Sequence, residues 1–252
     1  FLFILVIAAA IISRIWISKG PSSQDSQAKA LFESNCAICH NTTGDGKGEA
    51  AFLLYPKPRT FRAGKFRLVT SQNLQPTRDD LFRTISNGMP GTAMPSWAHL
   101  SESKRMVLAD YLLKLNRDGW YDRGIQLSYL PGEARKYAAE MTEAGEPIPI
   151  PPEPASTAIG LEQGRKYYVT ACSKCHGEKG EGKRDPTWRT AEGFPTSSRN
   201  LRRGVFKGGR DGKQLYLRFS TGLPGTPMPN GELAGDQVWR VVQYIQSLSD
   251  PT

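Results

Sequence analysis

The sequence Cys36-Ala-Ile-Cys39-His40 recurs downstream as Cys172-Ser-Lys-Cys175-His176. These two motifs contain all four cysteines of the chain, so the sequence offers no cysteine for a disulfide elsewhere. Two thiols three residues apart lie on one face of a helix, and Cys-x-x-Cys-His is the signature of haem c attachment. In such a site the two sulfurs bond the vinyl groups of the porphyrin, and the histidine ligates the iron. The sequence therefore predicts two covalently attached haems c.

A Cys-x-x-Cys pair can also be a redox dithiol or one half of a zinc site. In a zinc ribbon the second pair follows the first at about 15–20 residues. Here the two pairs lie 136 residues apart, and each is followed directly by a histidine. The spacing therefore disfavours zinc and supports haem.

Each motif begins a longer internal repeat. Arg59-Thr-Phe-Arg62-Ala-Gly64-Lys-Phe66-Arg67 corresponds to Arg199-Asn-Leu-Arg202-Arg-Gly204-Val-Phe206-Lys207. Gly88-Met-Pro-Gly91-Thr-Ala-Met94-Pro95 corresponds to Gly222-Leu-Pro-Gly225-Thr-Pro-Met228-Pro229, and Tyr111-Leu-Leu-Lys-Leu115 corresponds to Tyr244-Ile-Gln-Ser-Leu248. Because the blocks keep their order and nearly their spacing, the sequence predicts two units of one fold.

Both units are predicted to be helical, because their apolar residues recur at helical spacing and strand signals are few. Three helices are expected in each unit: 28–36, 78–87 and 101–116 in the first, and 164–172, 211–221 and 235–248 in the second. Ser101 is the candidate N-cap of the third helix. Long loops rich in Gly and Pro join these helices, which suggests a large group filling each core. The predicted fold class is all-α.

A methionine occupies the same position in both repeats, and it is the predicted second iron ligand. Met94 and Met228 each lie in a loop bounded by Pro and Gly, which would hold a thioether rigidly over the iron. Ligation by His and Met raises the potential of a haem. The alternative role of a methionine is to fill a core. Met89 is the main rival in the first unit, but its counterpart is Leu223.

With these motifs, each unit resembles a class I cytochrome c domain, over about residues 25–117 and 160–250. The resemblance implies that the first and last helices of each unit cross through aromatic contacts, Phe32 with Tyr111 and Tyr168 with Tyr244. It also implies that a proline carbonyl accepts a hydrogen bond from each ligating histidine. The candidates are Pro56 or Pro58 for the first unit, and Pro186 or Pro195 for the second.

Arginines recur in register between the units and are candidates for contacts with the haem propionates, since a guanidinium pairs well with carboxylates. The predicted contacts are Arg59 and Arg62 in the first unit and Arg199 and Arg202 in the second. The other basic residues of the two blocks are weaker candidates. The alternative interpretation is a solvated basic face.

The chain begins with an apolar run, Phe1 to Ile12, which Ile15, Trp16 and Ile17 extend. A spanning helix needs about 20 mostly apolar residues, so residues 1–20 are predicted to form a transmembrane signal-anchor. The alternative is a cleavable signal peptide, since Ala8-Ala9-Ala10 resembles a cleavage site. With the anchor, we expect a single-pass protein of a bacterial inner membrane whose haem domains lie on the periplasmic face.

The predicted domain organisation follows from the anchor and the repeat. Residues 1–20 form the anchor, 21–117 the first cytochrome c domain, 118–160 an extended linker and 161–252 the second cytochrome c domain. The linker contains the proline-rich tract 146–154, which favours an extended conformation. Before this tract, residues 135–141 can form a short helix, and the segment 117–143 is expected to pack against one or both domains.

The charge of the chain, with 33 basic and 24 acidic residues and a net +9, suits an acidic partner or cofactor. No Lys/Arg-rich run of 5–8 residues indicates nucleic-acid binding. Iron held by His and Met binds no substrate, so the sequence predicts an electron carrier rather than an enzyme. Tandem domains on one anchor resemble dihaem subunits of respiratory membrane complexes, which implies redox partners among other subunits.

The alternative function is a peroxidase-like dihaem enzyme with one open iron. Such an enzyme needs an acid or base group beside the iron. His99 is the only histidine outside the two motifs, and it is interpreted as a surface residue. A haem-based sensor would need a signalling domain, for which the sequence gives no sign.

Overall fold

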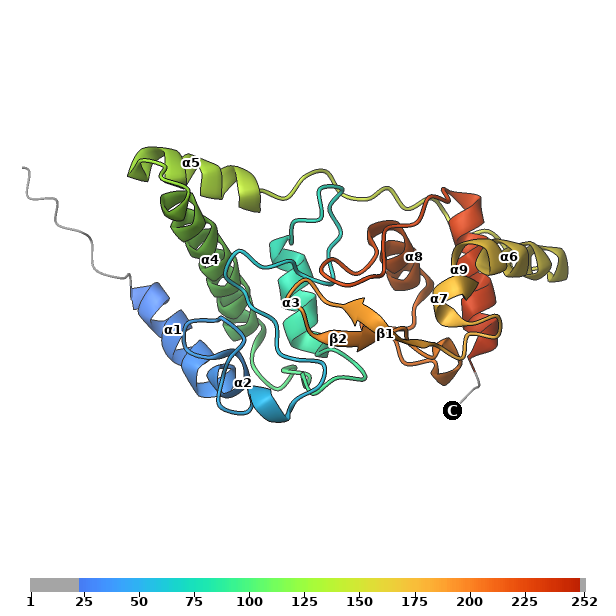
Figure 1. Ribbon diagram of the computed structural model, residues 1–252, viewed down its shortest axis with the longest axis horizontal. Helices are drawn as coiled ribbons and strands as arrows, with labels where there is room; N and C mark the ends of the chain where they lie inside the picture. Colours follow the sequence, from blue (N-terminus) through green and yellow to red (C-terminus); the bar gives the residue numbers. More distant parts are fainter. Residues whose placement is uncertain (1–22, 250–252) are drawn as a thin grey trace, which may run out of the picture.

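The computed structural model describes residues 23–249, which form two lobes joined by an extended segment (Figure 1). The first lobe contains α1 (Ser23–Asn35), α2 (Ala37–His40), η1 (Ala51–Leu53), α3 (Arg78–Asn87) and α4 (Glu102–Gln126). The second contains α6 (Ala158–Ala171), α7 (Ser173–His176), η2 (Leu201–Arg203), α8 (Gly212–Thr221) and α9 (Asp236–Leu248). Helix α5 (Pro131–Thr142) lies between them in the sequence. The helices of the two lobes thus follow the repeat.

The first and last helices of each lobe pack on each other through a pair of aromatic rings. Phe32 of α1 and Tyr111 of α4 have ring centroids 5.3 Å apart at an angle of 52°. Tyr168 of α6 and Tyr244 of α9 are also 5.3 Å apart, at 55°. Phe32 and Tyr168 are fully buried. The expected aromatic crossing is therefore confirmed in both lobes, and it places α2 and α7 beside the cores.

Side-chain caps set the start of the inner helices. The Thr77 side chain accepts a hydrogen bond from the Asp80 backbone N–H, and the Asp80 carboxylate accepts one from Thr77, so that α3 begins with a capping box. Asp211 caps α8 in a similar way. Ser101 caps α4, as its position in the sequence predicted. These caps fix where α3, α4 and α8 begin.

Helix α4 ends at Gln126 rather than at residue 116, because its C-terminal part packs on α5 and not on the core of the lobe. Gly124 permits the approach, since a Cβ there would lie 3.1 Å from Ala134 Cα. Ala134 is fully buried in this contact. The short helix expected at 135–141 is thus part of a longer one, which forms a helical hairpin with α4 (Figure 1).

The prediction of an all-α fold is wrong, because the second lobe contains a small antiparallel sheet. Strand β1 (Arg184–Arg189) pairs with β2 (Pro195–Ser197), and the register joins Arg184 to Ser197 and Arg189 to Pro195. Gly193, at φ +82°, makes the turn between them. The second repeat has the room for this hairpin, since His176 and Arg199 are 23 positions apart and His40 and Arg59 only 19.

The prediction of a single-pass protein of a bacterial inner membrane is corrected as well. Among residues 23–249, no helix combines the length and the apolar character that a membrane crossing requires. The longest, α4, has 25 residues but carries charges along its whole length. The transmembrane helix predicted at 1–20 lies outside the described residues.

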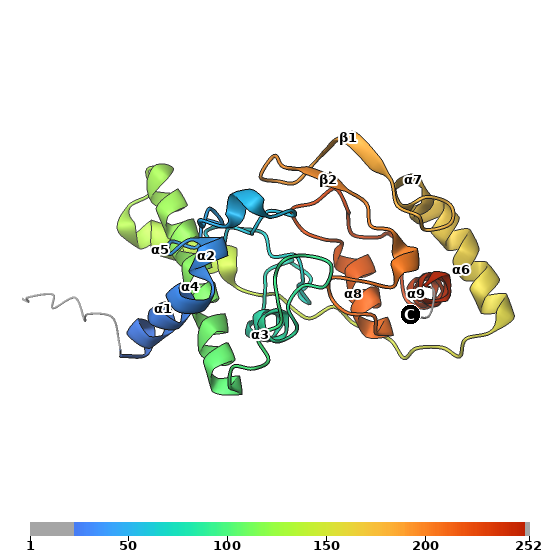
Figure 2. The same ribbon diagram turned by 90° about the horizontal axis from the view of Figure 1, so that it is seen from below.

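The proline-rich segment between the lobes is attached to both of them. On the first lobe, Ile148 N–H donates to Thr70 O at 2.8 Å. On the second lobe, Trp239 Nε1 donates to Pro151 O at 2.9 Å. The views of Figures 1 and 2 show this segment running along the side of the two lobes, which lie next to each other. The proline-rich segment therefore contacts both lobes.

Candidate functional site

Each Cys-x-x-Cys-His motif forms one helical turn at the end of the first helix of its lobe. His40 N–H donates to Cys36 O, and His176 N–H donates to Cys172 O, both at 2.9 Å. Burial raises the pKa of Cys36 to about 12 and that of Cys172 to about 11. The thiols of Cys36 and Cys172 are thus protonated at neutral pH, and both residues are half-buried.

The two histidines have identical backbone partners. His40 Nδ1 lies 3.0 Å from Arg59 O, and His176 Nδ1 lies 3.0 Å from Arg199 O. A carbonyl only accepts, so Nδ1 carries the proton and Nε2 keeps a free lone pair. Burial lowers the pKa of both imidazoles, and the carbonyl opposes this in part. Both rings are therefore neutral and suited to ligate a metal through Nε2.

The prediction of a proline carbonyl behind each histidine is wrong. The acceptors are Arg59 and Arg199, which are equivalent positions of the repeat. Arg59 follows the candidate Pro58 directly, so the error in the first lobe is one residue. In the second lobe the hairpin moves the candidates Pro186 and Pro195 away from the histidine.

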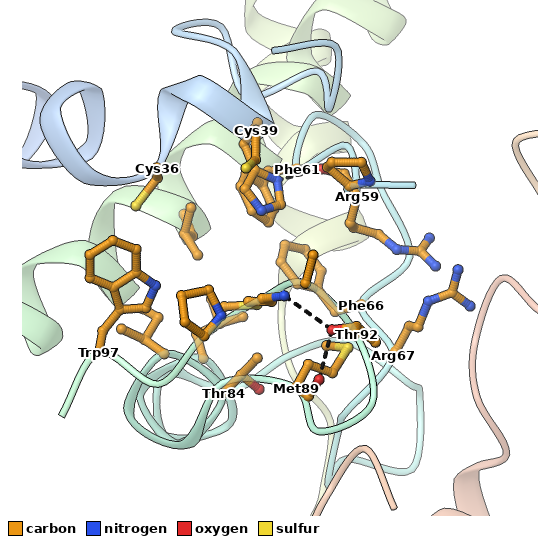
Figure 3. Close-up of a pocket in the computed structure, with 18 of the residues that line it drawn as sticks. Cys36, Cys39, Arg59, Phe61, Phe66, Arg67, Thr84, Met89, Thr92 and Trp97 are labelled. Carbon is orange, nitrogen blue, oxygen red and sulfur yellow. Dashed lines mark hydrogen bonds between the residues drawn. The ribbon is translucent and has the colours of Figure 1, made fainter. Parts of the chain in front are cut away.

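An apolar crevice opens beside the motif of the first lobe. Its walls include Phe61, Phe66, Leu81, Ile85 and Leu108. Figure 3 shows Cys36 and Cys39 on one side and Met89 on the opposite side. The His40 ring stacks on Phe61 with centroids 4.5 Å apart, which fixes its orientation. The crevice suits a flat apolar group bonded to the cysteines.

The methionine loops of the two lobes have the same hydrogen bonds. Met94 N–H donates to Thr92 Oγ1 and Met228 N–H to Thr226 Oγ1, both at 3.2 Å. Met94 O accepts from Met89 N at 3.0 Å, and Met228 O accepts from Leu223 N at 3.1 Å. Met94 and Met89 both line the first crevice. The repeat thus encodes one rigid loop, which presents its methionine half-buried in each lobe.

The four arginines predicted to meet propionates have different surroundings. Arg59 lines the first crevice and forms an ion pair with Glu192 of the second lobe at 2.6 Å. Arg62 pairs with Asp122 of α4 and does not line this crevice. Arg199 donates to Val205 O at 3.1 Å, and Arg202 is exposed.

Two further cations lie where sequence reasoning gave them little or no weight. Arg67 and Lys207, which are equivalent in the repeat, both line the first crevice, although Lys207 belongs to the second lobe. The sequence shows that Arg67 and Lys207 are equivalent, but it does not show that they line the same crevice. The Arg59 Nη2 and Arg67 Nη1 atoms are buried and have no hydrogen-bond partner among the described residues. Unpaired donors at the rim of an apolar crevice fit a haem, which carries carboxylates on one edge.

His99 lies apart from the crevice. It is exposed, and its ring lies 5.4 Å from that of Trp97. It is absent from the residues that line the first crevice, so it supplies no acid or base group there.

Comparisons with known proteins agree with the two-lobe arrangement. Residues 161–249 match the family described as cytochrome c, and residues 23–112 match the family of cytochrome C oxidase, cbb3-type, subunit III. The chain is also similar to a solved chain of a reducing HAO-like protein complex from Kuenenia stuttgartiensis, with 30% identity and a TM-score of 0.74. That match covers 89% of this chain and 96% of the other. No curated protein matches the sequence.

Proposed function

Because the chain belongs to the cytochrome c family and holds two covalently attached haems c, we propose that it carries electrons between redox proteins through both of its lobes. Haem c, when bound, supplies reversible one-electron chemistry at its iron. The predicted ranges 21–117 and 161–252 are proposed as the two haem-binding domains.

In this proposal each motif fixes one haem by three residues. Cys36 and Cys39 attach the first haem and Cys172 and Cys175 the second, while His40 and His176 ligate the irons. Support comes from the neutral state of both histidines, whose Nδ1 atoms are 3.0 Å from Arg59 O and Arg199 O. Such a bond keeps the ring from rotating and makes Nε2 a better ligand.

Met94 and Met228 are proposed as the second ligands, and the observation that carries the function is the identity of their two loops. The Thr92 and Thr226 hydroxyls hold the two methionine backbones at the same distance of 3.2 Å. A thioether held in this way would ligate the iron of a bound haem and would leave no position there for a substrate. A saturated iron exchanges electrons with little rearrangement and suits a carrier.

We further propose that the chain works as one subunit of a redox complex. The support is the similarity, over most of both chains, to a chain of a reducing HAO-like protein complex. The partners in such an assembly would be other redox proteins that accept or supply the electron.

The test is an optical redox titration of the holoprotein, with carbon monoxide added to the reduced form. Two low-spin c-type couples and no carbon monoxide adduct are expected, since both irons are saturated. Binding of carbon monoxide to the wild type would instead mean an open iron, and would make a peroxidase-like enzyme the better description.

A further inference from the structure

Arg59 and Arg199 each connect the two lobes. The carbonyl of each arginine holds the histidine of its own lobe. The guanidinium of each lies against the methionine loop of the other lobe, Arg59 on Gly225 and Arg199 on Gly91, so closely that a Cβ on either glycine would contact it. Since the residues are equivalent in the repeat, the two contacts are related as if by a twofold axis.

Arg67 and Lys207, which are equivalent in the repeat, are two further cations at this contact between the lobes. Burial and the nearby charges of Arg199, Arg67 and Arg59 lower the pKa of Lys207 to about 8. Burial, and then the charge of Arg59, lower the pKa of Arg67 to about 10. Arg59, Arg67 and Lys207 line the same cavities at the contact between the lobes, and Arg199 reaches this contact at Gly91.

Three of these cations lie between the first crevice and a second cavity. A second cavity between the lobes is lined by Arg59, Arg67 and Lys207, which also line the first crevice. Glu192 pairs with Arg59 in this region at 2.6 Å, and one carboxylate does not balance four cations. Like charges that are partly removed from water are costly unless acceptors meet them.

Buried donors without acceptors occur at the same place. They are Arg59 Nη2, Arg67 Nη1 and Thr190 Oγ1, none of which has a hydrogen-bond partner among residues 23–249. Thr190 also lines the cavity between the lobes. Guanidinium groups and hydroxyls that point into one cavity are the donors that bind carboxylates.

We propose that Arg59, Arg67, Arg199 and Lys207 form one shared site, at the contact between the lobes, that binds propionates of both haems. The site deepens the proposed function and rests on it, because it requires a haem in each lobe. It makes Lys207, a residue of the second lobe, a positioning residue for the first haem. A positive charge beside a haem favours the reduced form, so these cations raise both potentials and couple them.

The experiment compares Lys207→Gln with Lys213→Gln, which removes an exposed cation of the same lobe. Both potentials are measured by optical titration of the holoprotein. The couples are assigned with Met94→His and Met228→His, since replacing a methionine ligand lowers the potential of the affected haem. We expect Lys207→Gln to lower the potential of the first haem clearly, and Lys213→Gln to leave it unchanged.

Lys207→Arg provides the second variant, because it keeps the charge and is expected to keep the potential of the first haem. A first-haem couple that stays in place in Lys207→Gln would overturn the shared site. This outcome is distinct from failure of the proposed function. An iron that binds carbon monoxide would refute the saturated carrier, but the first-haem couple would still report on Lys207.

Discussion

Arg218 of α8 donates a hydrogen bond of 2.7 Å to the backbone carbonyl of Val69 in the other lobe. A second bond from the same guanidinium reaches Arg67 O at 2.9 Å. Arg218 is 7% exposed, and burial lowers its pKa to about 10 while Asp80 opposes the shift. Backbone carbonyls of the first lobe thus accept hydrogen bonds from a buried charge of the second lobe. The contact between the lobes therefore involves buried residues of both.

Replacing this arginine should loosen the contact between the lobes. Arg218→Met removes the donor and leaves the carbonyls of Arg67 and Val69 buried and unpaired, at a cost of about 1–3 kcal/mol each. We expect a lower midpoint of thermal unfolding and faster proteolysis in the segment 143–157. Arg202→Met is the matched control on an exposed position. Equal midpoints for the two variants would contradict the role given to Arg218.

The choice between two methionines in the first crevice can be tested directly. Met94→Ala should open the first iron, which would then bind carbon monoxide and show a lower potential. Met89→Leu copies the second repeat, where Leu223 stands at this position, and should leave the spectrum unchanged. The measurement is the optical spectrum of the reduced protein with and without carbon monoxide. The opposite pattern would make Met89 the ligand.

The methionine loop of the second lobe depends on a glycine. Gly222 has φ +63°, and a Cβ there would lie 2.5 Å from the backbone of Pro229, which follows Met228. Gly222→Ala should displace Met228 and weaken the absorption band that iron–methionine ligation gives, in the second haem alone. Gly193→Ala is the control, because Gly193 has a similar φ of +82° but open space around it. A full methionine band in Gly222→Ala would show that the loop can adapt.

The potential of the first haem should depend on pH through Lys207. Burial and the charges of Arg199, Arg67 and Arg59 lower the pKa of Lys207 to about 8, and nearby carboxylates would raise it again. Below this pKa the charged amine favours the reduced haem. As the pH rises through it the charge is lost, so the potential should fall in a step at or above pH 8. In Lys207→Gln this step should vanish. A step that persists in the variant belongs to another group.

Sequence reasoning succeeded where the information is local and repeated. The cysteine motifs and the methionine loops are specified by residue type and spacing, whereas the aromatic pair Phe32 and Tyr111 was expected from the resemblance to class I cytochrome c domains. The Ser101 cap was also visible, because capping depends on a few adjacent residues. The helices α3, α8 and α9 lie within one residue of their predicted bounds, whereas α1 and α6 begin five and six residues earlier than predicted and α4 continues into a hairpin.

The features that were missed depend on contacts between the lobes or on small insertions. The sheet of β1 and β2 arises from extra residues in the second repeat, which carry no strong strand pattern. Arg62 was favoured over Arg67 because an arginine, Arg202, stands at the equivalent position of the second repeat. In the structure Arg62 pairs with Asp122, which lies in the part of α4 beyond the predicted helix, while Arg67 lines the crevice.

The crossed contacts of Arg59 with Gly225 and of Arg199 with Gly91 have a consequence for the ancestry of the chain. An interface in which equivalent residues exchange places is isologous, the kind found in symmetric homodimers. One repeat therefore carries both halves of the contact, and a single ancestral domain could have paired with its own copy through the same surface. The formation of such a dimer depends on protein concentration. After duplication and fusion the two domains are linked in one chain, so their association is intramolecular. In this view the proline-rich segment is the linker that joined two copies of the domain into one chain.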